Sequence, residues 1–275
     1  MLKISVLTLF FHILLLSTTS GFAEESGGTF QWPDGVRAAV NLAYDDALDS
    51  QLDNAIPSLD RYGFKGSFYL VMSAPTVRER MEEWRTIAAN GHELGNHSLF
   101  HPCSGGKPGR DWVEPWKDLD SMSVEEVRQH VVLSNTMLFA MDGQTERTYA
   151  ATCGDLYASG EPYLKTVEPE LVAIKARISE FGVTPSMEAV DPWSVVVVTP
   201  SEVSGQELIS MVKKAAELGT MVNFTFHGIG GDYLQVSAQA HDELLQYLSD
   251  NQDIYWVDTF INIMKYVKQQ QGVNP

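Results

Sequence analysis

The 275-residue sequence is poor in positive charge. It holds 19 lysines and arginines against 36 aspartates and glutamates, which gives a formal net charge of −17. Such a chain would repel phosphate groups, so nucleic acids and anionic membranes are not expected as partners. A neutral or cationic partner fits this charge, although an acidic surface also serves solubility.

Cysteine is equally scarce and occurs only at Cys103 and Cys153. In an exported protein two cysteines most simply form one disulfide, and two buried free thiols are the alternative. Internal repeats, low-complexity stretches and linkers are also lacking. The roughly 250 residues after the N-terminal segment therefore favour one large domain over two small ones.

Apolar runs are short except at the N-terminus. Lys3 precedes the run ISVLTLFFHILLL, which is too short to span a bilayer comfortably. Small residues follow, with Gly21 and Ala23 where a signal peptidase would read them. We therefore expect a signal peptide over 1–23, one domain over 24–275, and a secreted or periplasmic protein without stable membrane insertion. A retained membrane anchor is the alternative.

Short apolar segments alternate with amphipathic ones along the rest of the chain. Strands are expected at 37–44, 67–71, 92–96, 147–151, 170–176, 220–226 and 254–257. Helices are expected between them, one of which begins at a capping box formed by Ser123 and Glu126. This alternation predicts an α/β fold with a parallel sheet closed, or nearly closed, into a barrel.

Ionisable residues stand where several expected strands end. Asp45 and Asp46 directly follow the first strand. His97 and His101 follow the third, and His227 follows the penultimate one. Each pair alone would be compatible with a surface turn. The carboxyl ends of parallel strands meet at one face of a barrel, however, so together these residues predict a site there.

The residue types indicate a metal-assisted reaction. One aspartate oxygen and two imidazoles suit zinc or another divalent transition metal, and three protein ligands leave a position for water. Adjacent residues of an extended segment point in opposite directions, so one of Asp45 and Asp46 can hold the ion while the other accepts a proton. His227 could then protonate a leaving group.

Three motifs resemble those of a known family. AYDDA at 43–47, NHSLFHP at 96–102 and FTFHG at 224–228 are similar to motifs one, two and five of the polysaccharide deacetylases, carbohydrate esterase family 4. They occur in the family's order. The resemblance implies a distorted (β/α)7 barrel of the NodB-homology type. It also implies hydrolytic removal of acetyl groups from a polysaccharide or oligosaccharide.

The same resemblance implies roles for individual residues. Asp45 matches the catalytic base and His227 the general acid. Asp46, His97 and His101 match the ligands of one divalent ion, with zinc favoured and cobalt or nickel as alternatives. The backbone N–H of Cys153 matches the donor that stabilises the oxyanion.

The third motif departs from the family, because AATCG at 150–154 replaces its arginine-proline loop. Ala150 stands where an arginine that steadies the base is expected. Arg177 could reach in from the next strand to compensate, or lie at the surface. Cys103 and Cys153 belong to loops of the same barrel face, so we predict a disulfide between them.

Further residues are candidates for substrate binding. Asp191 and Trp193 resemble residues that line the family's cleft: Asp191 could orient His227, and Trp193 could stack on a sugar ring or pack into the core. Asp232 and Tyr233 could reach substrate from the loop behind His227.

Two histidines are interpreted as structural. His92 is expected to be a hydrogen-bonded residue of the third strand rather than a metal ligand. His241, on the penultimate helix, is expected near the surface.

Several functions stay open on the sequence alone. The acetyl group removed could be N-linked or O-linked, since the same site chemistry serves both. A hydrolase of non-sugar amide bonds is a further alternative. The missing arginine of motif three also permits a carbohydrate-binding protein that kept the barrel and lost catalysis.

Overall fold

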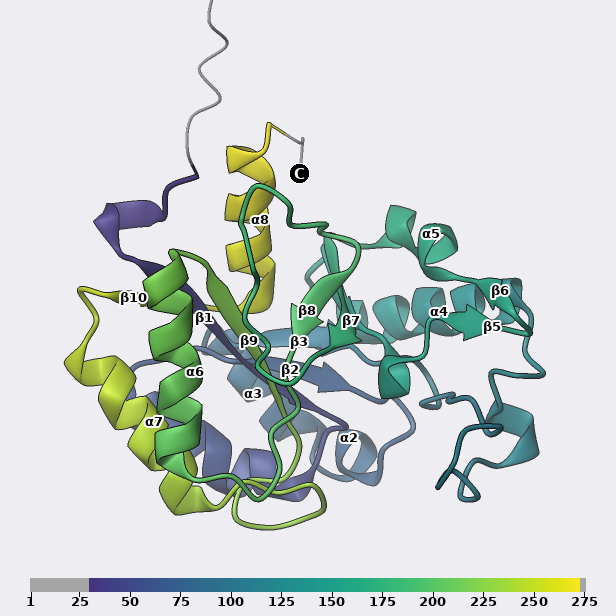
Figure 1. Cartoon of the computed structure of the whole chain (residues 1–275). Helices are drawn as coiled ribbons and strands as arrows, with labels where there is room; N and C mark the ends of the chain where they lie inside the picture. Colours follow the sequence, from purple (N-terminus) through teal and green to yellow (C-terminus); the bar gives the residue numbers. More distant parts are fainter. Residues whose placement is uncertain (1–29, 273–275) are drawn as a thin grey trace, which may run out of the picture.

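A nearly closed barrel of mostly parallel strands is the centre of the molecule (Figure 1). The computed structural model describes residues 30–272. The strands of the ring, in order, are β1 (Ala38–Asp45), β2 (Ser67–Leu70), β3 (Glu93–Asn96), β4 (Thr148–Ala150), β7 (Ala173–Ile178), β8 (Val195–Val197) and β9 (Met221–Phe226). β9 pairs with β1, and a single bridge from Val198 to Phe224 links the β8 side to β9. The expected distorted barrel is therefore confirmed.

The ring differs from the prediction in one strand: it contains β8, which was not expected, in place of β10. β10 (Tyr255–Val257), which was expected in the ring, pairs only with the first three residues of β1, and β2 pairs with the last three. β10 thus extends the sheet beside the first half of β1 and is not part of the ring. The sequence analysis missed β8, because a run of four valines beginning at Val195 has neither the length nor the alternation that marks a strand.

Helices cover the outside of the barrel. They are α1 (Ile56–Tyr62), α2 (Pro75–Glu79), α3 (Met81–Ala89), α4 (Val124–Asp142), α6 (Gly205–Leu218) and α7 (Ala238–Asp250). The predicted capping box of Ser123 and Glu126 starts α4, and Gly143 ends it with a left-handed φ of 72° that glycine adopts without strain. The segment 179–194, between β7 and β8, is irregular, and this missing helix is the main distortion of the fold.

Several shorter elements lie in the connections between the strands of the ring. A π-helical turn η2 (Gln51–Ala55) leads into α1. The long connection from β4 to β7 carries η4 (Thr152–Gly154), the antiparallel pair β5 (Tyr157–Ala158) and β6 (Glu161–Pro162), then α5 (Leu164–Val167) and η5 (Glu168–Glu170). Two further 3-10 turns are η1 (Pro33–Gly35) and η3 (Pro115–Lys117).

His241 lies in the core between barrel and helices, not near the surface as expected. It is fully buried on α7, and its Nε2 is 2.7 Å from the hydroxyl of Tyr44. The reason is helical spacing. Position 241 shares a face with the buried Leu244, Leu245 and Leu248, so the stripe that packs on the barrel carries the histidine inward.

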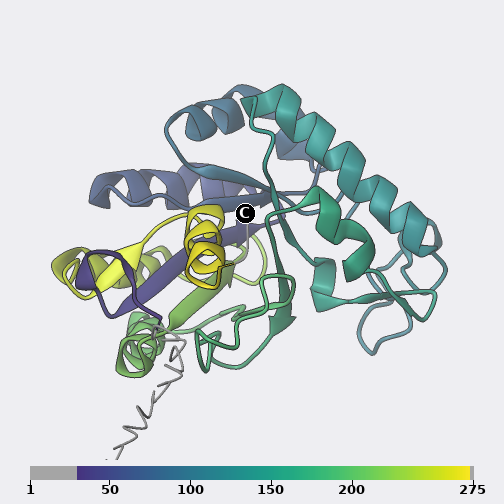
Figure 2. The ribbon, with the colours of Figure 1, turned by 90° about the horizontal axis from the view of Figure 1, so that it is seen from above.

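The amino end of the barrel is closed by α8 (Phe260–Gln270), which is seen end-on near the middle of the ring in Figure 2. Glu93 of β3 is buried there and accepts hydrogen bonds from Ser67, Thr148 and the backbone N–H of Ile261. A carboxylate at a helix N-terminus satisfies backbone donors that the helix itself leaves free. This end of the barrel is therefore filled and hydrogen-bonded.

Within residues 30–272, no helix combines the length and apolar character needed to cross a membrane. The expected signal peptide over 1–23 lies outside the described residues.

Candidate active site

The carboxyl end of the barrel opens into a cavity of about 900 Å³. Asp45 is the last residue of β1 and Asp46 follows it, His97 and His101 follow β3, and His227 follows β9. All five line the cavity. The structure thus brings together the five residues that the strand-end pattern singled out.

Asp46, His97 and His101 form a compact set of possible metal ligands. Oδ1 of Asp46 is 3.2 Å from Nε2 of His97 and 3.3 Å from Nε2 of His101. Two ligand atoms on a tetrahedral zinc ion, each about 2.0–2.1 Å from the metal, stand about 3.3 Å apart. Oδ1 is also buried with no hydrogen-bond partner among the described residues. These three side chains therefore fit one divalent ion.

The protein orients the two imidazoles. Nδ1 of His97 donates to the backbone oxygen of Ala150 at 2.8 Å, which leaves its Nε2 facing Asp46. Asp46 and His101 have positive φ angles of 81° and 54°. Backbone strain of this kind, outside glycine, is kept chiefly where the surrounding structure holds a functional geometry.

The three possible ligands shift one another's pKa values. Burial would raise the pKa of Asp46, but the close contact with His97 and its charge, with His101 and His227 nearby, hold this pKa well below its usual range. Burial, together with repulsion from His97, lowers the pKa of His101 to about 4. Asp46 is therefore an anion and His101 a neutral imidazole near neutral pH, which are the forms that bind metals. Burial would lower the pKa of His97, but the charges of Asp45 and Asp46 raise it, so a metal ion would have to displace a proton from this imidazole.

Asp45, the neighbour of Asp46 in the sequence, faces a lysine. Oδ2 of Asp45 is 3.8 Å from Nε2 of His97, and its Oδ1 is 3.5 Å from Nζ of Lys175 on β7. Arg177, which could have compensated for the arginine missing at Ala150, is exposed instead. Of the two placements left open for Arg177, the structure shows the surface one. Regular alternation would put position 177 on the same side as position 175, but the register of β7 against β8 shifts between Lys175 and Arg177, and this irregularity breaks the alternation.

His227 and the loop after it complete the opposite wall. Nε2 of His227 is 3.7 Å from Oδ2 of Asp46, and the hydroxyl of Tyr233 donates to the same oxygen at 2.8 Å. Asp232 also lines the cavity, where its carboxylate accepts from the backbone N–H of Ser50. Both loop residues expected to reach substrate thus border the site.

Asp191 and Trp193 lie elsewhere. They precede β8 and so stand at its amino end, whereas Val197 and Thr199 bring its carboxyl end to the cavity. Asp191 accepts from the backbone N–H of Trp193, and the Trp193 ring lies 4.9 Å from Nζ of Lys268 on α8. Neither residue therefore reaches the cleft, because β8, unrecognised in the sequence, separates them from it. Trp193 instead packs against the hydrophobic core, the second of the two placements expected for it.

A disulfide joins the loop after β3 to the loop after β4. Cys103 and Cys153 are bonded, with their Cα atoms 5.8 Å apart. Cys103 lies two residues beyond His101, and Cys153 borders the cavity. The bond therefore ties a metal-ligand loop to the loop that carries the expected oxyanion donor.

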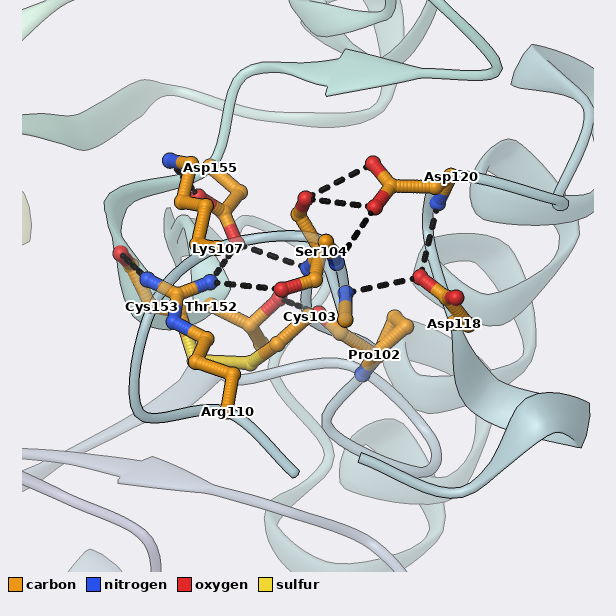
Figure 3. Close-up of polar contacts among 12 residues, drawn as sticks. Pro102, Cys103, Ser104, Lys107, Arg110, Asp118, Asp120, Thr152, Cys153 and Asp155 are labelled. Carbon is orange, nitrogen blue, oxygen red and sulfur yellow. Dashed lines mark hydrogen bonds and ion pairs between the residues drawn. A yellow bond between two sulfur atoms is a disulfide. The ribbon is translucent and has the colours of Figure 1, made fainter. Parts of the chain in front are cut away.

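A charged cluster reinforces this junction, as Figure 3 shows. Asp155 is buried and accepts from Lys107, from Arg110 and from the backbone N–H of Ser104 at 2.8 Å. Arg110 also donates to the backbone oxygen of Cys153 at 3.2 Å. Sequence reasoning missed this cluster, because charged residues within a polar loop show no periodicity.

Aromatic residues on the rim were also missed. Phe100 and Trp112 line the cavity, and Trp112 is 51% exposed with its ring 6.5 Å from that of His101. An aromatic ring held open beside a metal triad can bind the apolar face of a sugar. The loop 104–120 that carries Trp112 lacks a strand or helix pattern in the sequence, so nothing marked it in advance.

Comparison with known proteins agrees with this geometry. Residues 34–168 match the family model for polysaccharide deacetylase. Through these residues the chain belongs to the polysaccharide deacetylase family. The matched segment includes Asp45, Asp46, His97 and His101, and His227 lies beyond it. The family match supports a deacetylase enzyme, and the structural neighbours agree with it in fold.

Solved structures share the fold at low sequence identity. The Xyl-CE4 domain of a multidomain xylanase from the hindgut metagenome of Trinervitermes trinervoides is 18% identical, with a TM-score of 0.55 over 86% of this chain and 92% of that one. A protein of Mycobacterium smegmatis assigned to the polysaccharide deacetylases is 16% identical, with a TM-score of 0.60 over 90% and 95%. The peptidoglycan deacetylase PdaC from Bacillus subtilis is 17% identical, with a TM-score of 0.53 over 85% and 93%.

A gellan lyase from Bacillus sp is 34% identical over 74 residues. The match spans 27% of this chain and only 3% of that protein's length.

Proposed function

We propose that this chain is a secreted, metal-dependent hydrolase that removes acetyl groups from a polysaccharide or oligosaccharide, with its catalytic domain over 24–275. The single observation that carries the proposal is the Asp46, His97 and His101 set, which has tetrahedral spacing and an orphaned carboxylate oxygen beside a second aspartate. A mere sugar-binding barrel would need neither a base nor an acid at this place.

Residues of the chain would divide the reaction between them. A divalent ion held by the triad would lower the pKa of a water molecule and polarise the acetyl carbonyl. Asp45, which is not one of the three ligands, would accept the proton of the attacking water. His227, on the opposite wall, would protonate the departing sugar oxygen or nitrogen.

Backbone and rim would bind the rest of the acetylated sugar. The Cys153 N–H, on a loop held by the disulfide and by Arg110, would stabilise the oxyanion. Trp112 and Tyr233, both about half exposed, would contact the sugar rings on either side of the triad. The arrangement serves an ester or an amide, so it supports O-acetyl and N-acetyl substrates alike.

The metal follows from the donor set. Two neutral imidazoles and one carboxylate suit zinc, and cobalt or nickel would fit the same site. The other possible cluster, His101 with Cys103 and Cys153, is unsuited to a metal because both sulfurs are engaged in the disulfide.

Acetate release tests the proposal. The full chain, loaded with zinc, is incubated with acetylated xylan, chitooligosaccharides and peptidoglycan, with and without a chelator. We expect release from at least one substrate, loss of release in chelator and recovery when zinc is restored. A chain that binds these sugars with zinc present but releases no acetate would instead be the carbohydrate-binding alternative.

A further inference from the structure

Lys175 is a buried cation at the wall of the cavity. Its side chain is 1% exposed, and its Nζ has no hydrogen-bond partner among the described residues. The ammonium lies 3.5 Å from Oδ1 of Asp45 and 4.3 Å from the centre of the Tyr69 ring. Burying a charge costs several kcal/mol unless an opposite charge compensates it, so this position requires a reason.

The register of the sheet explains how Lys175 comes to be there. Lys175 of β7 is the direct partner of Ala150 of β4 in the parallel pairing of these strands. Partner residues on neighbouring strands lie about 4.8 Å apart and face the same side of the sheet. The small side chain of Ala150 therefore leaves space beside Asp45, and the neighbouring strand fills that space with a cation.

Two buried carboxylates face Lys175, and only one of them has a free oxygen. Glu93, the more distant one, is already hydrogen-bonded by Ser67, Thr148 and the N–H of Ile261. Oδ1 of Asp45, in contrast, has no hydrogen-bond partner in the described part of the chain and faces the ammonium. Burial lowers the pKa of Lys175, and the two carboxylates counteract this.

We propose that Lys175 is the positioning residue of Asp45. Its ammonium holds Oδ1, which directs Oδ2 toward His97 and the metal-binding triad, where Oδ2 is 3.8 Å from Nε2 of His97. The lysine thus supplies from β7 the cation that position 150 on β4 lacks. This inference rests on the proposed function, because the role of Asp45 as the base belongs to it.

The first test is a double-mutant cycle with Asp45→Asn, Lys175→Met and the combination of both. Loss of alignment at a reacting group costs about 10²-fold in rate. We expect Lys175→Met to lower kcat by about that factor with KM nearly unchanged. Because the lysine acts through Asp45, adding Lys175→Met to Asp45→Asn should cost little more. Parent-like kcat in Lys175→Met, or losses that multiply, would overturn the proposal.

Moving the cation back to β4 provides the second test. Ala150→Arg combined with Lys175→Met should recover part of the kcat lost in Lys175→Met alone, since the guanidinium can reach the same carboxylate from the partner position. Arg177→Met, two residues along β7 but exposed, is the matched control and should leave kcat unchanged. A purely structural lysine predicts no recovery and a lower melting temperature in Lys175→Met.

Crystal structures of the parent and of Lys175→Met separate this inference from the proposed function. If the parent releases no acetate, the proposed function fails, and the Asp45 conformation still tests the lysine. We expect the Asp45 carboxylate to rotate away from its parent orientation in Lys175→Met, and an unmoved carboxylate would refute positioning. Lys175→Gln serves if the methionine variant does not fold, and failure of both to fold would make the lysine structural.

Discussion

The two ends of the barrel hold buried charged residues of opposite character. At the amino end, Glu93 accepts three hydrogen bonds and α8 covers it. At the carboxyl end, Oδ1 of Asp45, Oδ1 of Asp46 and Nζ of Lys175 have no hydrogen-bond partner among residues 30–272. A buried unsatisfied group costs about 1–3 kcal/mol. A metal ion would complete Oδ1 of Asp46, whereas Oδ1 of Asp45 and Nζ of Lys175 offset each other's charge at 3.5 Å. Hydrogen bonding, rather than charge or burial, thus distinguishes Glu93 from Asp45, Asp46 and Lys175.

The largest expected effect is on turnover at the carboxyl end. Asp45→Asn removes the proton acceptor and no metal ligand, so kcat should fall by about 10²–10⁴-fold while zinc content stays at one ion per chain. Acetate release and elemental analysis on the same preparation check this. Turnover at the parent rate on an N-acetyl substrate would remove Asp45 from the mechanism.

The amino end should respond in stability instead. Glu93→Ala leaves the donors from Ser67, Thr148 and Ile261 without their acceptor, so unfolding should become easier by on the order of 2–4 kcal/mol. Urea denaturation measures the loss, and zinc content should stay unchanged. Loss of zinc at unchanged stability would show that the two ends are not separate in function.

A smaller effect concerns pH and the buried His241. Burial lowers its pKa from 6.5 to about 4 in the folded chain. As pH falls below 6.5 the unfolded chain takes up a proton that the folded chain excludes, so stability is present above that pH and is lost on acidification. The loss should be about 2 kcal/mol between about pH 7.5 and pH 5. Denaturation of metal-free parent and of His241→Gln at both pH values isolates this contribution, which the variant should lack.

The smallest effects should separate the two tryptophans that flank the barrel. Trp112→Ala removes a half-exposed ring beside the triad and should weaken binding of sugar substrates by about 1 kcal/mol. Trp193→Ala, at the amino end of β8, should leave KM for the same substrate unchanged. Substrate titration of both variants decides this. If KM rose in Trp193→Ala and not in Trp112→Ala, the sugar would bind near the amino end of β8, and the assignment of sugar binding to Trp112 would be wrong.

Strand-end chemistry could be predicted from the sequence because it is local. Asp45, His97 and His227 each directly follow a segment expected to be a strand, and parallel strands bring such positions to one face whatever the details of packing. The capping box at Ser123 and Glu126 is equally local and is present as predicted. Position relative to a strand end was therefore sufficient to predict these site residues.

Interactions between strands were decided by tertiary structure alone. Nothing near position 45 in the sequence indicates that Lys175 would contact Asp45, because that contact depends on the register of β7 against β4. The misplacement of Asp191 and Trp193 has the same origin, since it followed from one unrecognised strand. A sequence therefore determines which residues end a strand, whereas the pairing of strands determines which of those residues meet, because each strand acquires its neighbours only when the barrel closes.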